Sequence, residues 1–174
     1  MYDTHFPVKR YRKTLSFIKK YIGVTQTILD LGVKNPFTSI LLEEGYSVYN
    51  SSGEDLDEDY DILKEKKYDV LVALEIFEHL LNPYTILKNS TSSKIIISVP
   101  LRLWFSSAYR SKTDLWDRHY HEFEEWQLDW LLEKTGWKII DREKWTNPVR
   151  KIGIRPFLRF FTPRYYIVYA ERIQ

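Results

Sequence analysis

The stretch "TILDLGVKNPFTSILLEEGY", residues 27–46, contains a predicted strand, a turn and a predicted helix in direct succession. An apolar, partly β-branched run ends in Asp30 and Gly32, which is typical of a buried strand that enters a tight turn. Pro36 then stands near the start of a pattern of apolar residues at helical spacing. The order strand, glycine turn and helix resembles a nucleotide-binding turn, although Lys34 and Pro36 stand where further glycines are usual.

Strands and helices alternate through most of the chain, which predicts a parallel sheet covered by helices on both faces. The last two predicted strands have no clear helix between them, so we expect an antiparallel hairpin at one edge of the sheet. The predicted strands are residues 25–32, 46–50, 68–75, 93–100, 137–145 and 164–173. The predicted helices are residues 8–22, 35–46, 76–90 and 122–136, with a single helical turn at 62–67.

The composition indicates one ordinary globular domain that spans residues 1–174. Within it we distinguish an N-terminal helical segment, 1–26, and a basic-aromatic excursion, 148–163, between the last two strands. A net charge of +2 with 29% charged residues does not favour nucleic acid as a partner. The absence of cysteine excludes disulfides and thiolate chemistry, and no apolar run has the length of a membrane span. We therefore expect a cytoplasmic protein with no transmembrane segment.

Four segments together resemble the class I S-adenosylmethionine-dependent methyltransferases, in particular the group that contains the ubiquinone-biosynthesis O-methyltransferases. The most specific feature is a strand that ends in Glu-x-x-Glu-His and is followed by Asn-Pro. The four segments are "ILDLG" (28–32), "YDVLVALEIFEHLLNPYTIL" (68–87), "KIIISVP" (94–100) and "HYHEFEEWQLDWLLEKTGWKII" (119–140). The resemblance implies a three-layer Rossmann-like α/β fold, S-adenosylmethionine as cofactor and methyl transfer to a small molecule.

In an open parallel sheet the ligand lies beyond the carboxyl ends of the strands, where successive connections diverge. This rule places residues 30–34, 50–52 and 74–76 along one rim. By resemblance, the turn after the first strand contacts the methionine part of the cofactor, and the end of the second strand contacts its ribose. The residues expected to contact the cofactor are Asp30, Leu31, Gly32, Asn50, Ser52, Glu75 and Ile76.

Several positions depart from the pattern of the resembled family. Lys34 and Pro36 replace two glycines that allow the backbone to approach the cofactor closely. Ser52 would stand in for the acid that binds the ribose hydroxyls, and residues 53–67 are too few for the usual helix plus strand. Two hypotheses therefore stay open. We favour an active methyltransferase, and the alternative is an inactive domain that has lost its cofactor and serves as a binding or scaffold module.

The candidate catalytic residues are His79 and Glu78, which follow Glu75 by four and three residues. On a helix that begins there, one or both side chains could face the cofactor rim. His79 would then act as a general base or contact the acceptor, because imidazole can accept a proton near neutral pH. The alternative is that His79 only stabilises the turn through a hydrogen bond to a neighbouring loop.

Two further patterns could indicate a metal. The spacing of His119 and His121 would place both imidazoles on one face of a strand, but no third ligand is indicated by spacing. The acidic run at residues 54–61 lacks the glycine and closing glutamate of a calcium loop, so a solvated loop is favoured. We expect no metal.

Residues 149–164 form a basic segment without acids, interleaved with three phenylalanines. One hypothesis is a lid that binds an anionic or lipid-linked acceptor at a membrane surface. The other is an excursion of the edge hairpin that buries its phenylalanines and leaves its arginines in water. The basic residues are Arg150, Lys151, Arg155, Arg159 and Arg164, and the aromatic ones are Phe157, Phe160 and Phe161.

Overall fold

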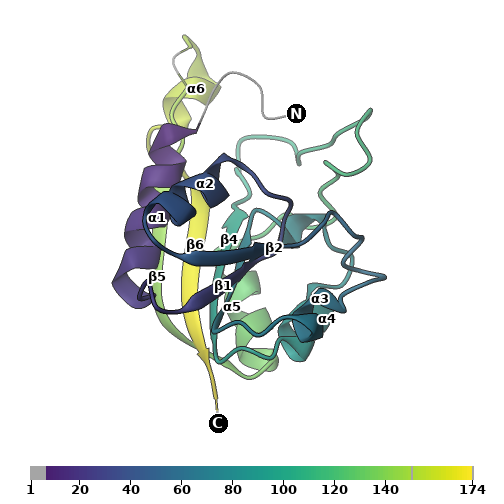
Figure 1. The fold of residues 1–174 in the computed structure, drawn as a ribbon. Helices are drawn as coiled ribbons and strands as arrows, with labels where there is room; N and C mark the ends of the chain where they lie inside the picture. The colour runs from purple at the N-terminus through teal and green to yellow at the C-terminus, as the bar shows by residue number, and fades with distance from the viewer. Residues whose placement is uncertain (1–6, 150, 174) are drawn as a thin grey trace.

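A computed structural model describes residues 7–149 and 151–173, in which six strands form one sheet in the order β2-β1-β3-β4-β6-β5 (Figure 1). The first four strands are parallel to one another, and β6 is antiparallel to both of its neighbours. This arrangement confirms the predicted α/β class with an antiparallel C-terminal hairpin. The strands are β1 (Thr27–Asp30), β2 (Ser47–Asn50), β3 (Val70–Leu74), β4 (Lys94–Pro100), β5 (Trp137–Thr146) and β6 (Pro163–Arg172).

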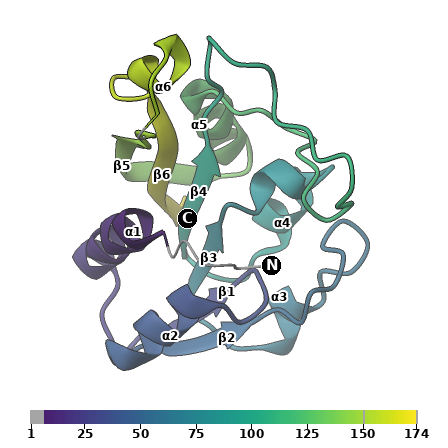
Figure 2. The same cartoon turned by 90° about the horizontal axis from the view of Figure 1, so that it is seen from above.

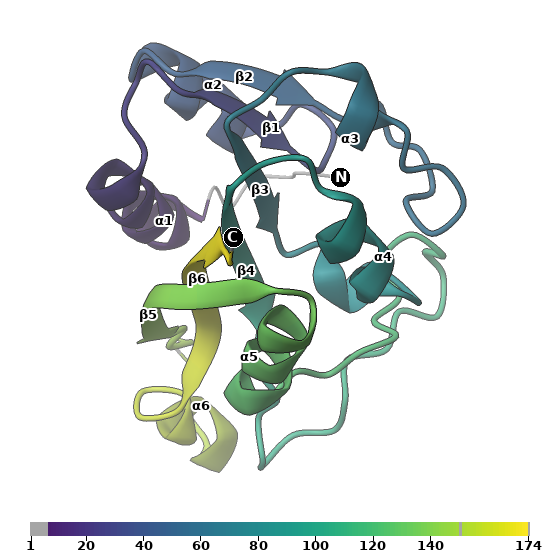
Figure 3. The same cartoon turned by 90° about the horizontal axis from the view of Figure 1, so that it is seen from below.

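Helices cover both faces of the sheet, as Figures 2 and 3 show from opposite ends. The helices α1 (Val8–Tyr21) and α2 (Pro36–Glu43) lie on one face, and α3 (Ile62–Glu65), α4 (Pro83–Asn89) and α5 (Glu125–Lys134) lie on the other. The side chains of strand β3 alternate between the two faces of the sheet, and helices cover both faces, so the strand is buried on both sides. Val70 and Val72 join the cluster under α1 and α2, whereas Leu71 and Ala73 join the cluster under the other three helices.

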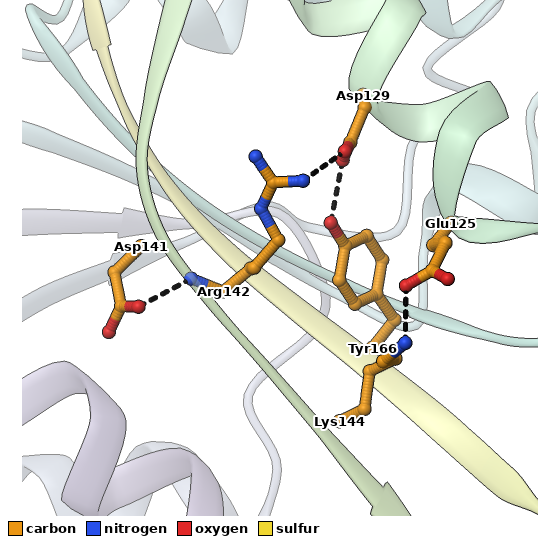
Figure 4. Close-up of polar contacts among 6 residues, drawn as sticks. All are labelled: Glu125, Asp129, Asp141, Arg142, Lys144 and Tyr166. Carbon is orange, nitrogen blue, oxygen red and sulfur yellow. Dashed lines mark hydrogen bonds and ion pairs between the residues drawn. The ribbon is translucent and has the colours of Figure 1, made fainter.

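Charged side chains of β5 fix the helices on both sides of the hairpin (Figure 4). Arg142 donates to Asp129 of α5, with 2.6 Å between the two atoms, and Lys144 donates to Glu125 at 2.5 Å. Tyr166 of β6 also donates to Asp129. Asp141, the residue before Arg142 in β5, points the other way, since it accepts from Tyr21 of α1. Alternation along the strand thus directs bases to one helix and acids to the other.

The predicted helix at residues 76–90 is wrong as a continuous element. A short 3₁₀ turn, η1 (Phe77–His79), is followed by an extended break, and α4 begins only at Pro83. Proline lacks the N–H of a helix interior and favours the first helical position. The break is stabilised by Asp57, whose carboxylate accepts from the backbone N–H groups of Leu81 and Asn82 at 2.7 and 2.8 Å.

The sheet has no strand beyond β2 in the described residues, and residues 53–67 return to β3 with only α3 between them. This agrees with the expectation that the segment is too short for a helix plus a strand. At the other edge, the excursion between β5 and β6 contains one short helix, α6 (Ile154–Leu158). Among the described residues, none of the helices has the length and apolar character needed to cross a membrane.

Candidate functional site

A cavity of about 200 Å³ lies at the carboxyl ends of β1 and β3. Its wall combines the turn after β1, the end of β3, one side of α1 and the start of α2. Such a position beyond parallel strand ends is where ligands bind in open α/β sheets. The lining residues are Arg10, Tyr11, Thr14, Asp30, Leu31, Gly32, Asn35, Phe37, Leu74, Glu75, Ile76 and Ser98.

Glu75 is held in the cavity by an unusual backbone conformation and two side chains. Its φ is 57°, in the left-handed region that residues other than glycine rarely adopt. Ser98 of β4 donates to Glu75 Oε1 at 2.8 Å, and Arg10 Nη1 of α1 lies 3.6 Å from Oε2. Burial raises the pKa of Glu75 above its ordinary value, while the Arg10 charge and the Ser98 hydrogen bond act in the opposite direction.

Asp30 is the last residue of β1, just before the turn, and it is buried. Asn50 of β2 donates to Asp30 Oδ2 at 3.1 Å and to the carbonyl oxygen of Gly32 at 3.0 Å. Burial raises the pKa of Asp30 to about 7, although the hydrogen bonds from Asn50 and Thr38 act to lower it. The amide of Asn50 therefore stabilises the conformation of the turn.

Five of the seven residues predicted to contact the cofactor line the cavity, namely Asp30, Leu31, Gly32, Glu75 and Ile76. Asn50 and Ser52 do not line it. Asn50 is used by the turn, and Ser52 is exposed in a loop where its backbone N–H donates to Glu54.

The two residues that replace glycines do not fill the cavity. Lys34 is exposed and absent from the cavity wall, and Pro36 is the first residue of α2. The N-cap of that helix is Asn35, whose side chain accepts from the backbone N–H groups of Phe37 and Thr38. Lys34 and Pro36, which depart from the glycine pattern, thus flank the N-cap residue of a well-capped helix.

Sequence reasoning missed the contribution of α1 and of β4 to the cavity. Arg10, Tyr11 and Thr14 carry no local signal, because the position of α1 over the rim is set by tertiary packing against α2 and β6. Tyr11 packs on Phe37 with ring centroids 5.2 Å apart, and Tyr21 stacks on Tyr169 at 4.4 Å. Ser98 did leave a signal, since it is a lone polar residue near the end of an otherwise apolar strand.

Glu78, His79 and His119 form a second group beside the cavity, which we call the Glu-His-His cluster. Glu78 is 1% exposed, and its Oε1 lies 3.8 Å from His79 Nε2. The rings of His79 and His119 meet edge to face with centroids 4.8 Å apart. Neither predicted catalytic residue, Glu78 or His79, lines the cavity itself.

Backbone hydrogen bonds attach the loop at residues 119–121 to the η1 turn. The N–H groups of Tyr120 and His121 donate to the carbonyl oxygen of Glu78 at 2.8 and 3.2 Å. The expectation that His119 and His121 share one face of a strand is wrong, because this segment is a loop. His121 Nε2 contacts the Leu81 carbonyl oxygen at 3.3 Å, whereas His119 packs on His79.

The pKa values in the cluster shift in the directions expected for buried groups. Burial, followed by the charge of Glu75, raises the pKa of Glu78 well above its ordinary value. Burial also lowers the pKa of His119 to about 4, and the neighbouring His79 and Arg164 act in the same direction. His119 is therefore unprotonated at neutral pH.

The phenylalanines of the basic-aromatic segment are exposed, so the hypothesis that the excursion buries them is wrong. Phe157 is 61% exposed and Phe161 is 70% exposed. Arg164 is not a free surface base, since it donates to the Leu101 carbonyl oxygen at 2.5 Å. Arg150 lies outside the described residues. Tyr165 pairs with Pro100 at the end of β4, so the excursion leaves the sheet at the same end as the cavity.

No protein-family model matches this sequence, and no curated protein matches it. Solved structures do match. A Burkholderia thailandensis 1,6-didemethyltoxoflavin-N1-methyltransferase, with 1,6-didemethyltoxoflavin and S-adenosylhomocysteine bound, is 19% identical with a TM-score of 0.64 over 94% of this chain and 78% of that chain. A Methanosarcina mazei S-adenosylmethionine-dependent methyltransferase is 13% identical, with a TM-score of 0.65 over 90% and 97%. A Synechocystis magnesium protoporphyrin IX methyltransferase with bound S-adenosylhomocysteine is 12% identical, with a TM-score of 0.56 over 94% and 82%. The chain therefore has the Rossmann-like fold of class I S-adenosylmethionine-dependent methyltransferases.

Proposed function

We propose that this protein binds S-adenosylmethionine and transfers its methyl group to a small-molecule acceptor. The observation that carries this proposal is the cavity at the carboxyl ends of β1 and β3. Its wall contains the backbone turn at Leu31 and Gly32 and the rim carboxylate of Glu75, the residues that sequence reasoning assigned to the cofactor. Further support comes from the Burkholderia and Synechocystis methyltransferases of the same fold, which hold S-adenosylhomocysteine.

Methyl transfer is an in-line displacement at the sulfonium of the cofactor. An acceptor lone pair forms the new bond to the methyl carbon, and the electrons of the carbon–sulfur bond pass to sulfur to give S-adenosylhomocysteine. The protein must align donor and acceptor and, for a weakly acidic acceptor, remove a proton. We assign these acceptor-side roles to His79 and Glu78, because η1, which carries both, begins two residues after Glu75. The resemblance of this motif to the ubiquinone-biosynthesis group favours an oxygen acceptor.

Calorimetric titration with S-adenosylhomocysteine tests cofactor binding. We expect micromolar affinity, about −8 kcal/mol. A Gly32→Leu variant should lose this binding, because a side chain at Gly32 enters the cavity toward Ile76 Cδ1, 3.6 Å from the added Cβ, without backbone strain. Gly23→Leu is the matched control, since Gly23 lies at the opposite end of β1 and also has an ordinary φ. Absence of binding by the folded natural protein contradicts the proposal.

The inactive-scaffold alternative is tested by a Lys34→Gly variant in the same titration. Because Lys34 is exposed and outside the cavity wall, we expect its affinity to differ from the natural protein by less than threefold. If binding were absent in the natural protein and appeared in Lys34→Gly, the side chain would be closing an inherited pocket, and the scaffold hypothesis would replace ours.

The basic-aromatic segment supports an acceptor or surface of negative charge. Arg155 and the exposed Phe157 and Phe161 lie on or next to α6, beyond the end of the sheet that holds the cavity (Figure 1). Exposed aromatic side chains beside bases are typical of contact with anionic lipid surfaces. A doubly reversed variant, Arg155→Glu with Arg159→Glu, should lose co-sedimentation with vesicles that contain phosphatidylserine. Equal sedimentation of the variant and the natural protein contradicts this contact.

A further inference from the structure

A second cavity, of about 360 Å³, lies within the loop that joins β4 to α5, and we call it the loop cavity. Its volume falls in the range of small-molecule sites, about 300 to 1,000 Å³, so it has room for a whole metabolite. The wall combines positive charge with rings. It includes the basic residues Arg110, Lys112 and Arg118 and the rings of Tyr109, His119 and Tyr120.

The three basic residues have no acid beside them in the wall of the loop cavity. Among the described residues, none of the ion pairs includes one of these three bases. Acids of the same loop are hydrogen-bonded to other donors. Tyr109 donates its backbone N–H to Glu122 at 2.7 Å and its hydroxyl to Asp117, and Asp114 accepts from the backbone N–H of Trp116 at 3.0 Å. Three cations around one cavity favour a ligand with more than one negative charge.

The loop cavity is attached to the turn that carries the proposed acceptor-side residues. The His119 ring in its wall meets the His79 ring edge to face, with centroids 4.8 Å apart. His79 Nδ1 donates to the carbonyl oxygen of Arg118 at 3.0 Å, because a carbonyl oxygen can only accept. The backbone N–H of Tyr120 donates to the carbonyl oxygen of Glu78 at 2.8 Å. A molecule in the loop cavity therefore lies close to His79.

Two guanidinium groups and one ammonium group suit a phosphate ester better than a carboxylate. A phosphate monoester has about 1.5 to 2 negative charges at neutral pH and three terminal oxygens, whereas a carboxylate has one charge and two oxygens. Arginine binds phosphate oxygens through paired hydrogen bonds, and lysine adds a compact positive charge. The rings of Tyr109 and Tyr120 are 44% and 50% exposed, and they offer apolar surface to the organic part of such a ligand.

We propose that the loop cavity binds a phosphate group of the methyl acceptor, so that the acceptor is a phosphorylated small molecule. This inference rests on the proposed function. The phosphate lies among Arg110, Lys112 and Arg118, and the organic part extends past His119 toward His79. Methyl transfer takes place at another atom of the acceptor and leaves the phosphate unchanged. The binding energy of the phosphate orients the acceptor and selects it over molecules that lack this group.

The test is calorimetric titration of the full chain with phenyl phosphate, a soluble phosphate monoester that has one ring. We expect one site per chain and an affinity about tenfold or more above that for benzoate, which has the same ring and a single charge. Arg110→Gln and Arg118→Gln should each weaken phenyl phosphate binding about tenfold. Arg102→Gln is the matched control, because Arg102 lies on the same loop but outside the cavity wall, 3.6 Å from Glu124, and it should change affinity less than about twofold.

Both arginines are exposed, so their replacement should leave the fold intact, and an unchanged midpoint of thermal unfolding checks this. The proposal is overturned if phenyl phosphate does not bind, if benzoate binds equally well, or if both arginine variants bind as the natural protein does. Titration with S-adenosylhomocysteine separates this result from the proposed function. Cofactor binding without phenyl phosphate binding removes the phosphate site alone. Phenyl phosphate binding without cofactor binding removes the methyltransferase proposal and leaves a phosphate site.

Discussion

The raised pKa of Asp30 makes the stability of the protein depend on pH in a direction that can be calculated. The folded state holds this carboxyl at a pKa of about 7, against an ordinary value of 3.8 in the unfolded chain. Between these two values the unfolded chain has lost the proton and the folded chain has kept it. The unfolded state therefore gains relative stability as pH rises, and the free energy of unfolding falls until about pH 7.

From pH 5 to pH 8 this carboxyl alone lowers the free energy of unfolding by about 2 to 3 kcal/mol. Asp30→Asn removes the titration but keeps an oxygen that can accept from Asn50. Urea unfolding of both proteins at pH 5, 6, 7 and 8 measures the effect as the difference between them. His119 acts in the opposite direction, since its lowered pKa means that stability is lost as pH falls below 6.5, and the difference between the two proteins cancels its contribution.

We expect the natural protein to lose about 2 to 3 kcal/mol relative to Asp30→Asn between pH 5 and pH 8. A difference that is the same at both pH values within about 0.5 kcal/mol refutes the assignment of a raised pKa to this buried group. The same ionisation affects the proposed cofactor. Because the amino group of S-adenosylhomocysteine is a cation, its affinity should increase from pH 6 to pH 8 in the natural protein and increase less in Asp30→Asn, where Glu75 is the carboxyl of the two that can still ionise.

Three further predictions concern packing and backbone conformation. Trp137 is fully buried and donates its indole N–H to a carbonyl oxygen at 3.2 Å. Trp137→Ala should therefore lower the free energy of unfolding, measured by chemical denaturation, by about 3 to 5 kcal/mol. The control is Trp116→Ala, which should lower it by less than about 0.5 kcal/mol because Trp116 is 71% exposed. Gly53 has a φ of 96°, and an added Cβ would lie 3.1 Å from a valine methyl, whereas Gly136 has a φ of 87° and open space around the added Cβ. Gly136→Ala should therefore lower the free energy of unfolding by about 1 to 2 kcal/mol, and Gly53→Ala should lower it further. Equal losses for the two variants would contradict the steric reasoning. Ser98→Ala removes the hydroxyl donor of the partly buried Glu75 carboxylate in the cavity and should cost about 1 to 3 kcal/mol at pH 8. A smaller loss is expected at pH 5, where that carboxyl is more protonated, and urea titrations at the two pH values check this.

Most of the fold could be predicted from the sequence because its signals are local. The apolar runs at β3 and β4 and the helical spacing in α1 and α5 each follow from the repeat of one element. The turn at Gly32 and the end of β3 at Glu75 could be placed on one rim because parallel strands share the direction of their carboxyl ends. Pro83 was the local signal against a continuous helix at residues 76–90, and the prediction did not use it.

The candidate site was predictable only in part. The residues after β1 and β3 were expected at the cavity, but Arg10 was not, since the packing of α1 over the rim depends on contacts with distant strands such as the one between Tyr21 and Tyr169. Asn50 was expected to face the ribose, and its amide instead binds Asp30 in the turn. Which of two nearby acceptors an amide meets depends on distances of an ångström, and no spacing rule in a sequence has that resolution.

By itself, the sequence determined the order of strands and helices, the single sheet with its antiparallel hairpin and the rim at which a ligand would lie. These properties follow from periodicity and chain direction, which short-range sterics and the burial of apolar side chains impose on each segment separately. Only the tertiary structure decided that His119 packs on His79 instead of lying beside His121 on one face of a strand, and that Arg10 pairs with Glu75. Such contacts join residues about 40 to 65 positions apart, and they depend on how complete helices and loops pack against the sheet, which is a property of the whole core.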